Sequence, residues 1–144
     1  MVKAENTEKQ RKVIKSPHFG QLEITHDLIY HFDDGIYGFE DLTEFVIVSE
    51  ERTDPFKWLL AVEKPELSFP LIDPWYIDNK YNPGKNYMSD SYAVYVIVTL
   101  KNEEGNISAN LKAPIVFELK ELTGQQLILT SDKYSTNFVL PLKK

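Results

Sequence analysis

Cysteine is absent from this 144-residue sequence, and long hydrophobic runs are missing as well. Without cysteine there can be no thiol catalysis, no thiolate-bound zinc, no iron–sulfur cluster and no disulfide framework. The longest strongly apolar run, residues 93–100, has eight residues, whereas a helix needs roughly 20 to cross a bilayer. The first dozen residues, MVKAENTEKQRK, lack the apolar stretch of a signal peptide. We therefore expect a soluble, cytoplasmic protein with no membrane partner.

Positive charge is scarce beyond the first residues of the chain. Residues 1–15 hold five basic and two acidic groups, so the net charge of −6 becomes −9 for the remainder. Such an acidic remainder repels nucleic acid phosphates and attracts basic protein surfaces. The same composition is also typical of a solvated face whose charges only keep the protein soluble. We expect no direct nucleic acid binding. Within residues 21–56, Arg52 is the only lysine or arginine against ten acids: Glu23, Asp27, Asp33, Asp34, Glu40, Asp41, Glu44, Glu50, Glu51 and Asp54.

Short apolar blocks rich in Val, Ile, Phe and Tyr make up most of the chain. Turn formers such as Asp34-Gly35 and Thr123-Gly124 separate them. The pattern predicts an all-β fold, a single small antiparallel β-barrel-like domain with at most short helical turns, at residues 25–29 and 41–45. Residues 1–14 are expected to form a disordered tail, residues 15–144 the domain, and residues 80–91 a polar loop. The blocks are residues 22–24, 45–48, 58–62, 67–72, 92–100, 115–119, 127–129 and 138–140.

Patterns typical of catalysis or metal binding are sparse. None of the three histidines, His18, His26 and His31, has the spacing of a local metal motif, and no nucleophile elbow or phosphate-binding loop occurs. His31 lies close to Asp33 and Asp34, so the alternative is a small β-barrel enzyme or ligand-binding protein that uses these three residues. Neighbouring residues on an extended chain point to opposite faces, which disfavours this cluster unless a turn gathers it. We expect no catalytic residue, no metal and no cofactor.

Six segments, taken in order, carry a resemblance to a known family. They are HFGQLEI at residues 18–24, HFDDGIYGFEDL at 31–42, PFKWL at 55–59, LSFPLIDP at 67–74, NLKAPI at 110–115, and GQQLIL at 124–129 followed by Tyr134. Together they resemble the FliW family of flagellar assembly factors, over residues 16–141. The resemblance implies a barrel that binds proteins and catalyses no reaction. The partners it implies are flagellin and the translational regulator CsrA, which a free FliW protein antagonises non-competitively, relieving repression of flagellin translation.

The segment at residues 31–42 combines turns, apolar anchors and acids. Phe32, Gly35, Gly38 and Phe39 are expected to be structural, because the glycines permit chain reversals and the rings can pin the loop to the barrel. Pro114 is expected at a strand start or edge, because it has no N–H to donate. The candidate partner-binding residues are the acids around this segment, one exposed aromatic and polar members of the later motifs: Asp33, Asp34, Tyr37, Glu40, Asp41, Glu44, Asn110, Lys112 and Gln126.

Overall fold

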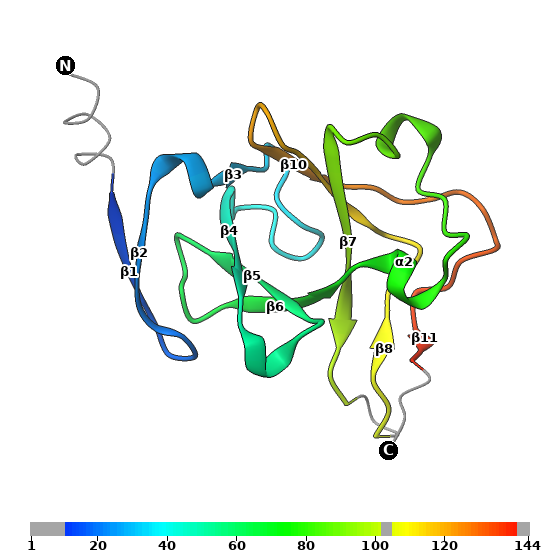
Figure 1. Cartoon of the computed structure of the whole chain (residues 1–144), viewed down its shortest axis with the longest axis horizontal. Coiled ribbons are helices and arrows are strands. Elements are labelled where there is room, and N and C mark those ends of the chain that lie inside the picture. The colour runs from blue at the N-terminus through cyan, green and yellow to red at the C-terminus, as the bar shows by residue number, and fades with distance from the viewer. Residues whose placement is uncertain (1–10, 102–104, 141–144) are drawn as a thin grey trace.

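A β-barrel forms the centre of the computed structural model, which describes residues 11–101 and 105–140. Within these residues, seven strands close in the order β7, β6, β5, β4, β3, β10, β9 and back to β7 (Figure 1). All neighbours are antiparallel except β3 and β10, which are parallel and joined at the pair His31 and Thr123. The predicted barrel-like fold is thus confirmed, with one parallel contact. The strands are β3 (Tyr30–His31), β4 (Glu44–Ser49), β5 (Lys57–Ala61), β6 (Ser68–Ile72), β7 (Tyr92–Thr99), β9 (Ile115–Glu118) and β10 (Thr123–Gln126).

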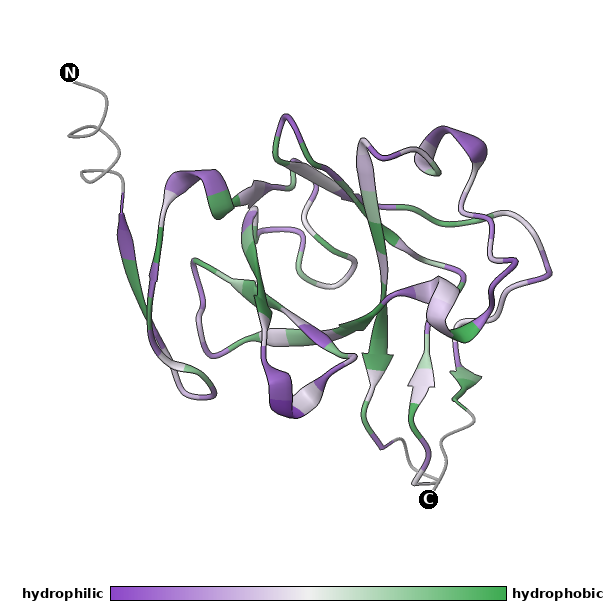
Figure 2. Ribbon diagram, viewed as in Figure 1, coloured by the Kyte–Doolittle hydropathy of each residue, from purple (hydrophilic) through white to green (hydrophobic). Residues whose placement is uncertain are grey.

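Alternation of side chains along the strands divides the barrel interior from its outer face. In β4, Phe45 and Ile47 point into the interior, while Val46 and Val48 point outward, as expected for a period of two. Figure 2 shows hydrophobic residues concentrated on the barrel strands, with the peripheral turns mostly hydrophilic. The interior cluster consists of Phe32, Ile36, Leu42, Phe45, Leu59, Ala61, Leu71, Ile115 and Phe117.

A hairpin of β1 (Lys12–Ser16) and β2 (Gly20–Ile24) covers the outer face of β4 and β5. Ile14 and Ile24 pack there against Val46 and Leu60, so the outward residues of the barrel gain a second core. Strand β1 begins at Lys12, within the segment expected as a tail, and Ile14 is buried in this contact. Residues 1–10 of the expected tail lie outside the described residues.

A third cluster covers the outer face of β7 on the opposite side of the barrel. There β8 (Ser108–Ala109), β11 (Phe138–Val139) and the one-turn helix α2 (Pro74–Ile77) surround Val96 and Val98. Tyr81 lies at its centre and donates its hydroxyl to the Leu111 carbonyl at 2.6 Å. Burial, with a smaller contribution from Tyr134, raises the pKa of Tyr81 well above its ordinary value. The segment expected as a polar loop at residues 80–91 is thus anchored by a buried ring at its start.

Helical structure within the described residues is limited to short turns, as predicted. The turn expected at residues 25–29 is the 3-10 turn η1 (His26–Leu28), but the one expected at residues 41–45 is wrong, because Glu44 and Phe45 begin β4 and pair with β3. Two further turns, η2 (Glu51–Thr53) and η3 (Lys85–Tyr87), join strands. Across residues 11–101 and 105–140, no helix has the length and apolar character needed to traverse a membrane.

Candidate protein-binding site

The loop that joins β3 to β4 is shaped by two glycines. Gly35 and Gly38 have φ angles of 64° and 89°, a region that favours glycine over other residues. The Phe39 N–H donates to the Ile36 carbonyl at 2.6 Å, which closes a tight turn with Tyr37 and Gly38 at its tip. At Gly35 an added Cβ would also lie 2.5 Å from the Phe39 carbonyl oxygen. Both the φ angle and the close approach of Phe39 therefore require glycine at position 35, whereas at position 38 the φ angle alone favours it.

Aromatic rings anchor the same loop to the barrel. The Phe32 ring is fully buried and makes edge-to-face contacts with Phe45 and Phe117, at centroid distances of 4.9 and 5.7 Å. This ring occupies the space that a side chain at position 124 would need, so glycine is required there in β10. Phe39 is half-buried and packs on Phe69 at 5.2 Å. The loop is consequently held at both its first residue and the far side of its turn.

Pro114 occupies a strand start. It lies buried immediately before β9, where no N–H is needed from it, and its carbonyl accepts from the Leu127 N–H at 2.8 Å. The apolar block expected as a strand at residues 127–129 follows β10 without joining it, although the Leu129 N–H still donates to the Lys112 carbonyl at 2.8 Å.

An open hollow of about 740 Å³, here called the acidic groove, lies over the outer face of β3, β10, β9 and the start of β7. Alternation turns Thr123, Gln125, Val116, Glu118 and Tyr92 outward to form its floor. The β3–β4 loop forms one wall with Asp33, Asp34, Gly35, Tyr37 and Glu40, while Tyr87 of η3 stands on the other side. His31, Gly124 and Gln126 complete the lining.

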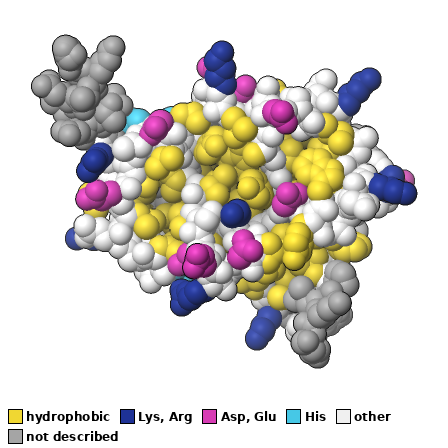
Figure 3. All heavy atoms as spheres, viewed as in Figure 1, with side chains coloured by type: hydrophobic (Ala, Val, Ile, Leu, Met, Phe, Trp, Pro, Cys, Tyr) yellow, Lys and Arg dark blue, Asp and Glu magenta, His cyan; other side chains and the backbone are white. Residues whose placement is uncertain are grey.

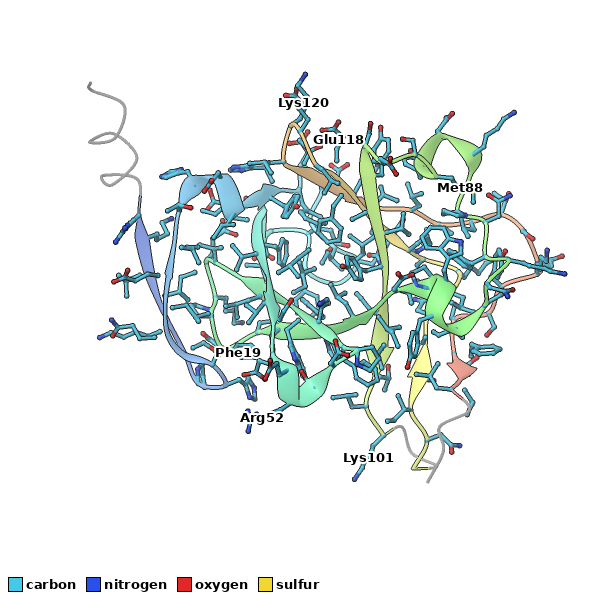
Figure 4. The ribbon with its side chains drawn as sticks, viewed as in Figure 1. Phe19, Arg52, Met88, Lys101, Glu118 and Lys120 are labelled. Carbon is cyan, nitrogen blue, oxygen red and sulfur yellow. The ribbon has the colours of Figure 1, made fainter. Side chains whose placement is uncertain are left out.

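The charges in the acidic groove have one sign. Four carboxylates line it, Asp33, Asp34, Glu40 and Glu118, and among its described lining residues there is no lysine or arginine. Two of the carboxylates are held by the backbone, since Glu40 accepts from the Gly38 N–H at 3.1 Å and Glu118 from the Glu121 N–H at 2.6 Å. Figure 4 shows Glu118 at the upper edge of the barrel, where β9 ends. Such a concentration of like charge attracts cationic groups.

Gln126 ties the loop wall to the barrel. Its Oε1 accepts from the Tyr37 N–H at 2.9 Å, and its Nε2 donates to the Ala113 carbonyl at 3.2 Å. Because the two ends of the amide each make one hydrogen bond within the chain, Gln126 positions Tyr37 at the groove and keeps one N–H and one lone pair for a partner. Tyr37 itself is 63% exposed and is available for contact.

The other candidate residues divide between the groove's surroundings and the turn that precedes β9. Asp41 is exposed but does not line the groove, and Glu44 faces Lys12 at 3.8 Å and His31 at 3.9 Å. Asn110 accepts from the N–H groups of Lys112 and Ala113 at 3.2 and 3.1 Å. Lys112 donates from Nζ to the Ser131 carbonyl at 3.0 Å. Asn110 and Lys112 therefore brace the approach to β9 and lie outside the groove.

Seven groove residues escaped the sequence reasoning: Tyr87, Tyr92, Val116, Glu118, Thr123, Gly124 and Gln125. Tyr87 and Tyr92 contact each other edge to face at a centroid distance of 5.1 Å, and Tyr92 is paired with Glu118 across β7 and β9. Alternation within the apolar blocks shows only that Tyr92 and Glu118 face away from Ala93 and Phe117. That they share a surface with the β3–β4 loop depends on strand order, which no local pattern in the sequence reveals.

His31, Asp33 and Asp34 do meet in the acidic groove, as the ligand-binding alternative requires, and the volume exceeds the roughly 300 Å³ of small ligand pockets. Such pockets are mostly apolar with a few polar groups, whereas this groove is open and carries four carboxylates. No group of three or more metal-ligating side chains occurs in the described part of the chain. The geometry therefore suits a cationic surface better than a small neutral ligand.

Comparisons with known proteins agree with this fold. The family described as FliW protein matches residues 12–140. The flagellar assembly factor FliW of Ruminiclostridium cellulolyticum is 36% identical over 136 residues, covering 85% of this chain and 90% of that protein. That of Thermoanaerobacter pseudethanolicus is 36% identical over 135 residues, covering 84% and 87%. A crystal structure of the flagellar assembly factor FliW matches with a TM-score of 0.80 and 32% identity, over 92% of this chain and 99% of that one. The chain therefore belongs to the FliW family, whose members are flagellar assembly factors and not enzymes.

Proposed function

We propose that this protein binds flagellin in the cytoplasm and, when free of flagellin, binds CsrA and antagonises it non-competitively, so that flagellin translation is no longer repressed. Membership of the FliW family supports this proposal. The observation that carries it is the acidic groove, whose carboxylates complement the basic surface that an RNA-binding protein needs for phosphate contacts.

Electrostatics explain how a docked acidic protein can oppose RNA binding without occupying the RNA site. Opposite charges raise the association rate of two proteins, and salt screens the effect over about 8–10 Å at physiological ionic strength. Once docked near a basic RNA groove, the carboxylates lower the positive potential that attracts phosphates. The expected result is a lower affinity of CsrA for RNA while this protein stays docked, without a shared binding site; bound RNA in turn weakens docking by the same factor.

Flagellin calls for a different surface, because a protein that binds through helices buries apolar faces. Exposed apolar side chains gather at the end of the barrel where β7, β8 and β11 meet: Leu100 is 43% exposed, Phe138 38% and Val139 48%. Figure 3 shows hydrophobic side chains gathered around β8 and α2 on this side. We assign flagellin to this end and CsrA to the acidic groove.

A pair of charge-reversed variants tests the assignment. Asp33→Lys/Asp41→Lys changes two exposed acids at and beside the groove, and Glu51→Lys/Glu66→Lys changes two exposed acids elsewhere with the same change in net charge. Glu44 is left intact because its partners are Lys12 and His31. The association rate with CsrA should fall about tenfold at low salt for the groove variant and less than twofold for the control, with smaller effects at high salt.

Flagellin binding serves as the internal reference for both variants. Its rate should change little, since the apolar end of the barrel is untouched. Equal slowing of CsrA association by the two variants would show that only net charge matters and would contradict a CsrA site at the groove. Failure of the unmodified protein to bind either partner would refute the proposed function as a whole.

A further inference from the structure

The acidic groove has the shape and chemistry of a peptide channel, and we propose that it docks an extended, lysine- or arginine-bearing segment of a protein partner. This inference rests on the proposed function, because it assumes a protein partner, but it adds the form of the recognised element: a few consecutive residues of extended chain and not a broad folded surface.

The dimensions of the groove favour an extended segment. Its floor crosses four neighbouring strands, β3, β10, β9 and β7. Three inter-strand spacings of about 4.8 Å give a length of roughly 14 Å, which matches about four residues of extended chain at about 3.3 Å each. The β3–β4 loop lies beside β3 and β10, and Tyr87 of η3 contacts Tyr92 at the start of β7, so the loop and the turn bound the two ends of this row of strands.

The lining favours cationic side chains with long aliphatic stems. Asp33, Asp34 and Glu40 lie on one wall and Glu118 on the floor, so a bound segment would meet carboxylates from both the wall and the floor. Tyrosines accompany them: Tyr37 on the loop wall, with Tyr87 and Tyr92 in edge-to-face contact at 5.1 Å. Tyrosine rings accept ammonium and guanidinium groups on their faces and cover the methylene stems.

Beside the groove, Glu44 already engages a cation from an extended segment of this chain. Lys12, on strand β1, places its Nζ 3.8 Å from a Glu44 carboxylate oxygen, and the other oxygen of that carboxylate is 3.9 Å from Nδ1 of His31, which lines the groove. A lysine on extended backbone is thus compatible with this rim. The four carboxylates that line the groove, Asp33, Asp34, Glu40 and Glu118, have no cationic partner among the ion pairs of the described residues.

The test uses short fluorescein-labelled peptides and the full-length protein. An octapeptide of alternating lysine and threonine should bind saturably by fluorescence anisotropy, and the same peptide with glutamine for lysine should bind at least tenfold more weakly. The variant Asp33→Asn/Glu40→Gln/Glu118→Gln keeps shape and hydrogen-bond acceptors but removes three charges, and it should bind the lysine peptide at least tenfold more weakly than the parent. The control Glu51→Gln/Glu66→Gln/Asp132→Asn removes three exposed charges outside the groove and should change affinity less than twofold. Arg52, the neighbour of Glu51, lies at the edge of the barrel opposite Glu118 (Figure 4).

Three results would overturn the inference. Equal losses in the two charge-removed variants would mean that the peptide senses only net charge. Spermidine binding as tightly as the lysine peptide, with the same dependence on the groove acids, would make this a small-cation site. A tenfold gain in peptide affinity on deleting residues 2–10 would make the chain's own N-terminal segment, which carries Lys3 and Lys9, the resident occupant.

Binding measurements with the complete proteins CsrA and flagellin distinguish this inference from the proposed function. CsrA and flagellin are measured against the same variants in the same buffer. If CsrA binds the parent tightly while the lysine peptide does not bind, the peptide channel is refuted and the proposed function stands. If the peptide binds as described while neither whole protein does, the channel stands and the proposed partners are wrong.

Discussion

Replacing Gly124 with alanine should disrupt the contact that fixes the groove wall to the barrel. An added Cβ would overlap carbon atoms of the Phe32 ring, which is fully buried and braced by Phe45 and Phe117. Overpacking of this kind typically costs about 1–3 kcal/mol. The lower backbone entropy of alanine in the unfolded chain returns about 0.5–1 kcal/mol. We therefore expect a loss of about 1–2 kcal/mol in the free energy of unfolding.

Denaturant unfolding followed by circular dichroism would measure this loss, and a thermal scan should show a drop in Tm of roughly 2–8 °C. Gln125→Ala on the same strand, whose exposed side chain faces the groove, is the matched control and should stay within about 0.5 kcal/mol of the parent.

A double-variant cycle identifies the cause of the effect. Phe32→Leu removes the ring atoms that the new Cβ would overlap, so Gly124→Ala/Phe32→Leu should be less destabilised than the sum of the single variants by about 1 kcal/mol. Strictly additive losses, or a Gly124→Ala variant as stable as the parent, would refute the argument from close approach.

The remaining predictions concern a buried tyrosine, a side-chain acceptor and the tail. Burial holds the pKa of Tyr81 above its ordinary value of about 10, so the unfolded state ionises first and stability should fall as pH rises above about 10. Tyr81→Phe should lessen that fall in denaturant titrations between pH 8 and 11, and an unchanged slope would contradict the burial argument. Asn110→Ala leaves the N–H groups of Lys112 and Ala113 without their acceptor and should lower the free energy of unfolding by about 1 kcal/mol in denaturant titrations. Asn110→Asp should lower it clearly less because it keeps an acceptor. Equal losses would show that these two hydrogen bonds do not stabilise the turn. Deleting residues 2–10 should shift Tm by less than about 1 °C in a thermal scan, and a larger drop would mean that the tail packs on the domain.

The barrel was predictable because side chains along its strands alternate between the interior and the outer face, and this alternation is visible in the sequence. In β4 and β7, apolar residues that belong to the interior cluster alternate along the strand with apolar residues that belong to the outer clusters. Gly, Pro and Asp mark the turns between the apolar blocks. Strand β10 was missed because its sequence, TGQQ, is polar and carries glycine. There, the space needed by the Phe32 ring and the ties made by Gln126 outweigh strand propensity.

The site was predictable only in part for a related reason. Asp33, Asp34, Tyr37 and Glu40 could be grouped because one short loop carries them. Tyr92 and Glu118 could not, since they reach the same surface through the pairing of β7 with β9. Asn110 and Lys112 carry a motif whose hydrogen bonds support the backbone, and a motif alone does not distinguish support from recognition.

The acidic groove cannot form before the chain has been synthesised through Gln126. Tyr37 and Gln126, whose hydrogen bond joins the loop wall to the floor, are 89 residues apart in the sequence, and the barrel closes only when β10 meets β3. At translation rates of 5–20 residues per second, roughly 4–18 s separate the synthesis of these two residues. Contacts so distant also make folding slow relative to a helical protein of similar size. A nascent chain that lacks β10 therefore cannot bind any partner that needs the groove. Binding at the groove requires a chain in which the barrel has closed.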